Sequence, residues 1–182
     1  MTPLRHVRRQ GAYYRVCKPE WAACSDTTYA KRLGGRWTPP EEFGALYLCA
    51  TIEVAAAVAR THHVGRAIPL FSLRPSRRPQ LQAFTVVTNQ FVDVVTDEGV
   101  AAAGLPPAYP YGVDHKACWP VARQACSLGA RGVACRSAAE PGPDFWLGEE
   151  LAVFDNGPMP KAAGRRRPFS AWYPDVVPPL GS

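Results

Sequence analysis

The 182 residues suffice for one domain with a sizeable core, and a composition of 47% hydrophobic and 20% charged residues is typical of a globular protein. No apolar run approaches the roughly 20 residues of a membrane-spanning helix, so no membrane span is expected. The net charge of +6 belongs to the ends, because residues 1–10 and 158–182 each carry +3 and residues 11–157 are neutral overall.

Short apolar segments and separated helical patterns alternate irregularly along the chain. Residues rich in aromatic and β-branched side chains, or apolar throughout, predict strands at 12–17, 45–50, 69–74, 81–87, 91–95, 132–135 and 151–154. Helical spacing predicts helices at 51–62, 97–103 and 117–128. Thr51 is the expected N-cap of the first helix, and Pro120 lies in the first turn of the last, where a missing N–H is tolerated.

This order predicts an α+β fold, a compact mixed domain of short strands and separated helices, because regular βαβ alternation is missing. We expect the domain to span residues 11–157. A basic segment, residues 1–10, precedes it. Residues 158–182 hold six prolines and an arginine triplet without periodicity, and they are expected to be extended or disordered and dispensable for folding.

Charge within the neutral body is uneven, since residues 11–78 carry +5 and residues 79–157 carry −5. This asymmetry fits a site that meets an anionic ligand with the N-terminal half, although mutual attraction of the two halves explains it equally well. A nucleic-acid-binding protein that uses its basic ends is a further alternative, and the neutral body argues against it.

The six cysteines are scattered and form no C-x-x-C pair, so neither a zinc site nor dithiol chemistry is expected. The histidines have no metal-ligand spacing, and we expect no metal. The basic start is followed by no apolar stretch of the kind found in signal peptides. The sequence therefore favours reduced thiols in a cytoplasmic protein.

Two motifs carry the functional hypothesis. In GGRWTPPEEFGALYL, a loop brings Arg36 and Trp37, and the following strand brings Tyr47, which together suit a phosphate and a flat ring. In GVACRSAA, Ser137 follows an apolar strand. Each residue has an ordinary structural alternative: a surface arginine in an ion pair, a core tyrosine with a satisfied hydroxyl, or a turn serine.

Taken together with Arg15 in the first strand, these motifs resemble the RES domain family over about residues 12–155. That family comprises toxins of bacterial toxin–antitoxin modules, and it resembles ADP-ribosyltransferases in fold. The resemblance implies that the protein binds NAD as a substrate and breaks the nicotinamide–ribose bond by hydrolysis, phosphorolysis or transfer. It also implies a cognate antitoxin as partner.

Carried over residue by residue, the resemblance assigns NAD contacts to Arg15, Arg36, Tyr47 and Ser137. The arginines would hold the diphosphate, Tyr47 would stack on a ring, and Ser137 would orient the ribose or nicotinamide. Arg36, Tyr47 and Ser137 are also the expected catalytic residues, together with a carboxylate that stabilises positive charge on the ribose.

The carboxylate is where the sequence departs from the family. Relatives carry a glutamate about two turns into the helix, where this chain has Val58. Glu53 lies five residues earlier, roughly 140° around the helix. Glu150 or Glu149, just before the last predicted strand, is therefore the expected substitute. Because neighbouring strand residues face opposite ways, at most one should point into the site. The alternative is a catalytically silent relative that still binds a nucleotide.

Overall fold

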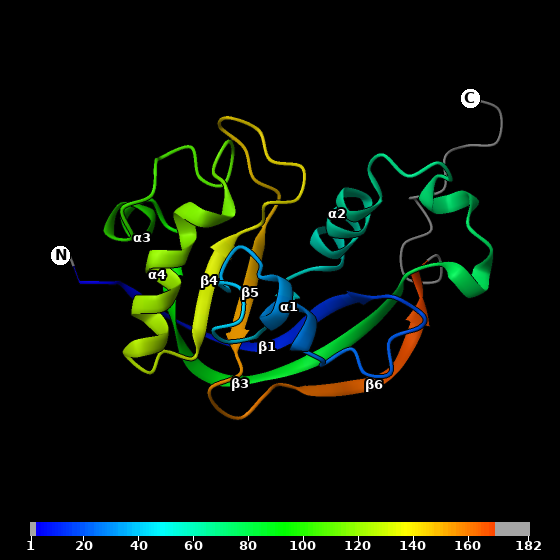
Figure 1. Ribbon diagram of the computed structural model, residues 1–182, viewed down its shortest axis with the longest axis horizontal. Helices are drawn as coiled ribbons and strands as arrows, with labels where there is room; N and C mark the ends of the chain where they lie inside the picture. The colour runs from blue at the N-terminus through cyan, green and yellow to red at the C-terminus, as the bar shows by residue number, and fades with distance from the viewer. Residues whose placement is uncertain (1–2, 170–182) are drawn as a thin grey trace.

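The computed structural model of the protein describes residues 3–169, and a six-stranded mixed sheet forms its centre (Figure 1). The strands are β1 His6–Cys17, β2 Ala45–Cys49, β3 Gln80–Val94, β4 Gly132–Arg136, β5 Glu149–Phe154 and β6 Lys161–Pro168. Their order is β1-β2-β5-β4-β3-β6, and β1 pairs with β3 as well as β2. Five strands therefore close into a ring, and β6 is added to β3 outside it.

All these pairs are antiparallel except β3 with β4. Side chains that alternate along the strands build two core regions. One region joins residues from all five ring strands, among them Tyr13, Leu46, Leu48, Phe84, Phe91, Ala134, Leu151 and Val153. The other lies on the opposite face of β2, β4 and β5, where Ala45, Val133, Ala152 and Phe154 pack against the helix that follows residue 114.

Within residues 3–169, four helices lie around the sheet: α1 Thr28–Leu33, α2 Ile52–His63, α3 Asp97–Ala102 and α4 His115–Ser127. In Figure 1, α3 and α4 lie together near β4, whereas α2 lies on the other side of the molecule, where it packs against β1. The predicted α+β class is confirmed by these elements. Among residues 3–169, no helix combines the length and apolarity needed to cross a bilayer.

The helix boundaries follow from capping chemistry. Thr51 is the N-cap of α2, as predicted, and its hydroxyl accepts the N–H of Val54 at 3.3 Å. The alanines of α2 are buried, so the helix approaches the sheet closely. Helix α4 begins earlier than predicted because Asp114 caps it by accepting the N–H of Ala117 at 2.9 Å. Because of this earlier start, Pro120 lies inside α4 and not in its first turn as predicted, so the helix lacks one backbone hydrogen bond there.

One strand prediction is wrong, and two other predicted strands are joined into one in the structure. Residues 69–74 were expected to form a strand, but this region contains two short 3₁₀ turns, η1 Leu70–Ser72 and η2 Pro75–Arg77. Pro69 and Pro75 explain the difference, because proline has no N–H to donate to a ladder. The strands expected at 81–87 and 91–95 form one long strand, β3, which pairs with β1 along most of its length.

Both ends of the chain contribute to the sheet. β1 begins at His6, so part of the basic N-terminal segment pairs with β3. The tail expected to be extended or disordered supplies β6, an extended strand that pairs with β3 from Gln80 to Thr85. Phe169 is buried against α2 residues and Leu70. The rest of the predicted tail, residues 170–182, lies outside the described residues.

The expectation of reduced thiols is wrong for one pair, since Cys17 and Cys24 form a disulfide. Four cysteines are free: Cys49, Cys118, Cys126 and Cys135. The disulfide closes the loop after β1, residues 18–23. The sequence showed no sign of it, because the spacing of seven residues matches no common metal or redox motif.

Candidate functional site

The loop with Gly35 and Arg36 is a tight turn that the hydroxyl of Tyr47 holds by hydrogen bonds. Gly35 and Thr38 pair with each other through their main chains, at 2.9 Å for the Gly35 N–H. The Tyr47 hydroxyl accepts the Trp37 N–H at 2.9 Å and lies 3.1 Å from the Thr38 hydroxyl. A Cβ on Gly35 would lie 2.7 Å from the Tyr47 oxygen, so this close support requires glycine.

Trp37 is fully buried, so the loop does not present an indole to a ligand as the sequence suggested. It packs edge-on against the ring of Tyr109 at 6.2 Å between centroids. Arg36 is half-buried, and its Nη1 donates to the carbonyl of Val113 at 2.8 Å. Its guanidinium lies 5.9 Å from the centre of the Tyr109 ring. Arg36 is therefore the charged side chain that this turn positions.

Ser137 and Glu150 form the central polar pair. Ser137 directly follows β4, is fully buried, and donates its hydroxyl hydrogen to Glu150 Oε1 at 2.5 Å. The hydroxyl oxygen of Ser137 accepts the N–H of Ala139 at 3.1 Å. Glu150 lies on β5 opposite both Cys49 of β2 and Cys135 of β4. The sheet thus places a carboxylate from residue 150 beside a hydroxyl from residue 137.

Burial raises the pKa of Glu150, because a charged carboxylate loses its hydration there. The Ser137 hydroxyl, the positive charge of Arg36 and the backbone N–H of Ala138 act in the opposite direction, since each stabilises the ionised form. Arg36 is therefore close enough to Glu150 to act on it electrostatically. Burial also raises the pKa of Cys49 and Cys135, and the negative charge of Glu150 adds to this shift.

Glu149 points away from this pair. Its carboxylate accepts two hydrogen bonds from Arg9, at 2.6 and 2.7 Å, and a longer one from the Tyr13 hydroxyl at 3.5 Å. The two glutamates thus diverge as strand geometry requires. Of the pair that the sequence offered, Glu150 is the one that the structure brings to Ser137.

Arg15 stands apart from these groups. Its guanidinium lies over the ring of Trp21 at 5.4 Å and donates to the carbonyl of Asp26 at 3.2 Å, so the segment around the disulfide loop holds it. Burial lowers its pKa to about 10, against the raising effects of Asp26, Cys49 and Tyr47. The structure therefore places Arg15 near β2 without contact to Ser137 or Glu150.

At the helix position where relatives carry a glutamate, the side chain of this protein makes apolar contacts. Val58 is half-buried on α2 and packs against the cluster of Cys49, Val54, Ala55 and Leu81. Glu53 is exposed in the first turn of α2. Hydrogen bonds from its own backbone N–H and from the Thr51 hydroxyl lower its pKa. Neither position supplies a carboxylate beside Ser137.

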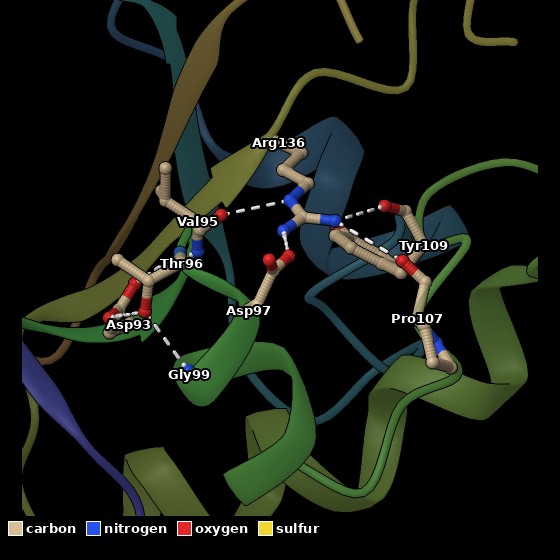
Figure 2. Close-up of polar contacts among 8 residues, drawn as sticks. All are labelled: Asp93, Val95, Thr96, Asp97, Gly99, Pro107, Tyr109 and Arg136. Carbon is tan, nitrogen blue, oxygen red and sulfur yellow. Dashed lines mark hydrogen bonds and ion pairs between the residues drawn. The ribbon is translucent and has the colours of Figure 1, made fainter. Parts of the chain in front are cut away.

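Tyr109 and Arg136 are candidate site residues that the sequence motifs do not identify. Tyr109 is 1% exposed and separates Arg36 from a second network around Arg136. Figure 2 shows Arg136 at the centre of that network, donating to the carbonyls of Val95, Pro107 and Tyr109 and to Asp97. The only sequence signal was aromatic content in a proline-rich stretch, which does not predict burial.

A carboxylate with a hydroxyl donor and a nearby guanidinium can perform a limited set of reactions. The ionised carboxylate stabilises a developing positive charge, such as that of an oxocarbenium ion, and can accept a proton from an attacking hydroxyl group. The guanidinium binds a phosphate. Tyr47 contributes to this cluster through the turn that it supports, with its hydroxyl already engaged.

Comparison with known proteins identifies the family and a similar fold. The fold is similar to a chain in the crystal structure of the M. tuberculosis MbcT–MbcA toxin–antitoxin complex, with a TM-score of 0.76 and 20% identity. That similarity covers 93% of this chain and 90% of the other. No curated protein matches the sequence significantly. The RES domain family matches residues 12–173, and the chain therefore belongs to the RES domain family.

Proposed function

We propose that this protein binds NAD and cleaves its nicotinamide–ribose bond as the toxin of a toxin–antitoxin pair. The observation that carries the proposal is the Ser137–Glu150 pair, a half-buried carboxylate bonded at 2.5 Å to a hydroxyl and within electrostatic reach of Arg36. The toxin role and an antitoxin partner are supported by membership of the RES family and by the similar fold in the MbcT–MbcA complex.

In this mechanism Arg36 binds the diphosphate and so fixes the ribose next to Glu150. The bond between C1 of the ribose and the nicotinamide nitrogen breaks, and its electron pair leaves with nicotinamide. The ionised Glu150 stabilises the oxocarbenium ion that remains. Ser137 orients the carboxylate. A water molecule, or inorganic phosphate, then attacks C1, and Glu150 accepts the proton released when water is the nucleophile.

The direct test is to incubate the purified protein with NAD and measure free nicotinamide, with and without inorganic phosphate. Release without phosphate indicates hydrolysis, and release that depends on phosphate indicates phosphorolysis. The absence of nicotinamide under both conditions would refute the cleavage reaction.

The second candidate, a silent relative that binds NAD without cleaving it, is favoured by one observation: Val58 occupies the position of the family's helix glutamate and packs in an apolar cluster. If the wild type binds NAD but releases no nicotinamide, and the Val58→Glu variant gains cleavage, this second candidate is correct.

Arg36→Ala should weaken NAD binding by more than about 1.5 kcal/mol, the scale of a hydrogen bond to a charged group. Titration calorimetry measures the change, and Arg32→Ala, at an exposed arginine of α1, is the matched control. Because Arg36 also bonds to Val113, a melting curve must show that the variant is folded. Equal affinity of folded variant and wild type would contradict the diphosphate role.

The pH dependence of cleavage should report on Glu150. Since burial raises its pKa, the rate should fall on the acid side at a higher pH than the ordinary glutamate value of about 4.3. The Ser137 hydroxyl lowers that pKa, so Ser137→Ala should move the acid limb to still higher pH. Ser127→Ala, on an exposed serine of α4, should leave it in place. An unmoved limb in Ser137→Ala would show that another group controls the reaction.

A further inference from the structure

A cavity of about 400 Å³ is lined in part by Tyr109, the residue whose ring also lies near Arg36, and its volume falls in the range of small-molecule sites. It is lined by residues of two loops, 107–109 and 142–146, together with Asp97 and Arg136. Aromatic rings come from Tyr109, Phe145 and Trp146, and carboxylates come from Asp97 and Asp144. The proposed reaction uses none of these carboxylates.

Arg136 contributes to the lining of the cavity a guanidinium that is held in place by hydrogen bonds. Its side chain is 7% exposed, and its donors bind the carbonyls of Val95, Pro107 and Tyr109 and one oxygen of Asp97 at 2.5 Å (Figure 2). These bonds tie together the end of β3, the start of α3 and the loop that contains Tyr109. The guanidinium therefore stays in place whether or not a ligand is present.

Trp146 lies with its ring 5.3 Å from the guanidinium carbon of Arg136, and it is half-buried. Phe145 also lines the cavity and is 56% exposed, so much of its ring remains accessible to a ligand. Two rings at the mouth of a cavity offer a stacking surface for a flat heterocycle. The exposed carboxylate of Asp144 can accept hydrogen bonds from amino or hydroxyl groups.

The positions assigned to the other parts of NAD select between its two ends. Because Arg36 is assigned to the diphosphate and Glu150 to the nicotinamide ribose, the cavity beside Tyr109 is left for the adenosine end. Adenine is flat and neutral, stacks well on aromatic and guanidinium planes, and carries an amino group for a carboxylate. The side chain of Asp97 is 91% exposed, so its second oxygen remains accessible to ribose hydroxyls.

We propose that this cavity binds the adenosine end of NAD, with adenine stacked on Trp146 and Phe145 and with Asp144 accepting from its amino or ribose hydroxyl groups. The proposal rests on the proposed function and extends it. Tyr109 connects the two sites, since its ring contacts both the cavity and Arg36, the residue assigned to the diphosphate. The nicotinamide end then lies toward Ser137 and Glu150.

The test is calorimetry with adenosine and, separately, nicotinamide mononucleotide. Trp146→Ala should weaken adenosine binding by about 5- to 150-fold, because stacking of a base on an aromatic side chain contributes about 1–3 kcal/mol. Asp144→Asn should weaken it several-fold. Neither variant should change the affinity for nicotinamide mononucleotide. Tyr29→Ala, which removes an aromatic side chain that is 58% exposed on α1, is the control and should bind adenosine like the wild type.

The outcomes separate this inference from the proposed function. Adenosine binding that depends on Trp146, without cleavage of NAD, supports the cavity assignment and refutes the reaction. Cleavage of NAD with unchanged adenosine affinity in folded Trp146→Ala refutes the cavity assignment and leaves the reaction standing. No measurable adenosine binding by the wild type at millimolar concentration also refutes the assignment.

Discussion

Glu150→Gln should reduce nicotinamide release from NAD by about 100-fold or more. Glutamine keeps the size and shape of the side chain and removes its charge, so the variant loses the group that stabilises positive charge on the ribose. Loss on this scale is typical when a preorganised charged or proton-accepting group is removed from an active site. Release of nicotinamide from saturating NAD, followed by chromatography, measures the effect.

Glu149→Gln is the matched control, because the same change on the neighbouring residue affects a carboxylate bonded to Arg9 and Tyr13. It should keep a rate near that of the wild type. If both variants keep the wild-type rate, the catalytic carboxylate lies elsewhere and the role assigned to Glu150 is wrong. If Glu149→Gln is the slower of the two, the strand alternation seen here does not describe the active protein.

Melting curves of Glu150→Gln and the wild type test whether unfolding, and not the lost charge, causes the lower rate. Burial raises the pKa of Glu150 above its unfolded value, so the folded protein holds this proton more tightly than the unfolded chain does. Stability from that proton is fully present below the unfolded pKa and is lost as the pH rises through the folded pKa. Glu150→Gln carries no such proton, and its melting temperature relative to the wild type should increase with pH.

A chain that ends at Gly157 should melt at least roughly 10 °C below the full-length protein, since about 1 kcal/mol corresponds to about 2–4 °C at this size. It lacks β6, which pairs with β3, and it lacks Arg166, whose Nη1 donates to the carbonyl of Trp21 at 2.6 Å. It also lacks Phe169, which is 4% exposed and packs against α2. The truncation uncovers β3 and the disulfide loop together.

A chain that ends at Phe169 keeps β6 and serves as the control for the removal of residues 170–182. Melting of the shorter chain within a few degrees of full length would mean that β6 adds little to the sheet. It would also mean that residues 158–182 are dispensable for folding, as their proline content suggests.

The sequence predicted best those features that depend on neighbouring residues. Thr51 and the alanines after it specify the start and the buried face of α2, and the strand at 45–50 is apolar enough to be identified alone. β6 was missed because its charged and small residues look like a solvated tail. A strand of this kind is stabilised by its hydrogen bonds to β3, and such a partner is not visible in local composition.

The candidate site shows the same difference between features that neighbouring residues predict and features that depend on a distant strand. Arg36, Tyr47 and Ser137 could be selected by their motifs, yet the contact between Ser137 and Glu150 exists only because β4 and β5 pair in one register. The choice between Glu149 and Glu150 depends on that register too, since a shift of one residue would exchange the faces of the two side chains. Arg15 matches its motif, but its partners come from the disulfide loop, which the sequence did not reveal.

The closed ring of strands has a consequence for the order in which this protein acquires its structure during synthesis. β1 emerges first, but its long partner β3 follows only after α2, and β2 must wait for β5, where Tyr47 lies opposite Ala152. Pairings so distant in sequence are slow to form, because a long loop must close before any contact is gained. The ribosome delivers Arg36 and Tyr47 before Glu150, so the polar pair with Ser137 is assembled only after β4 and β5 have been made. A nascent chain of this protein therefore remains without the proposed catalytic carboxylate until β5, the last strand of the ring, has been synthesised.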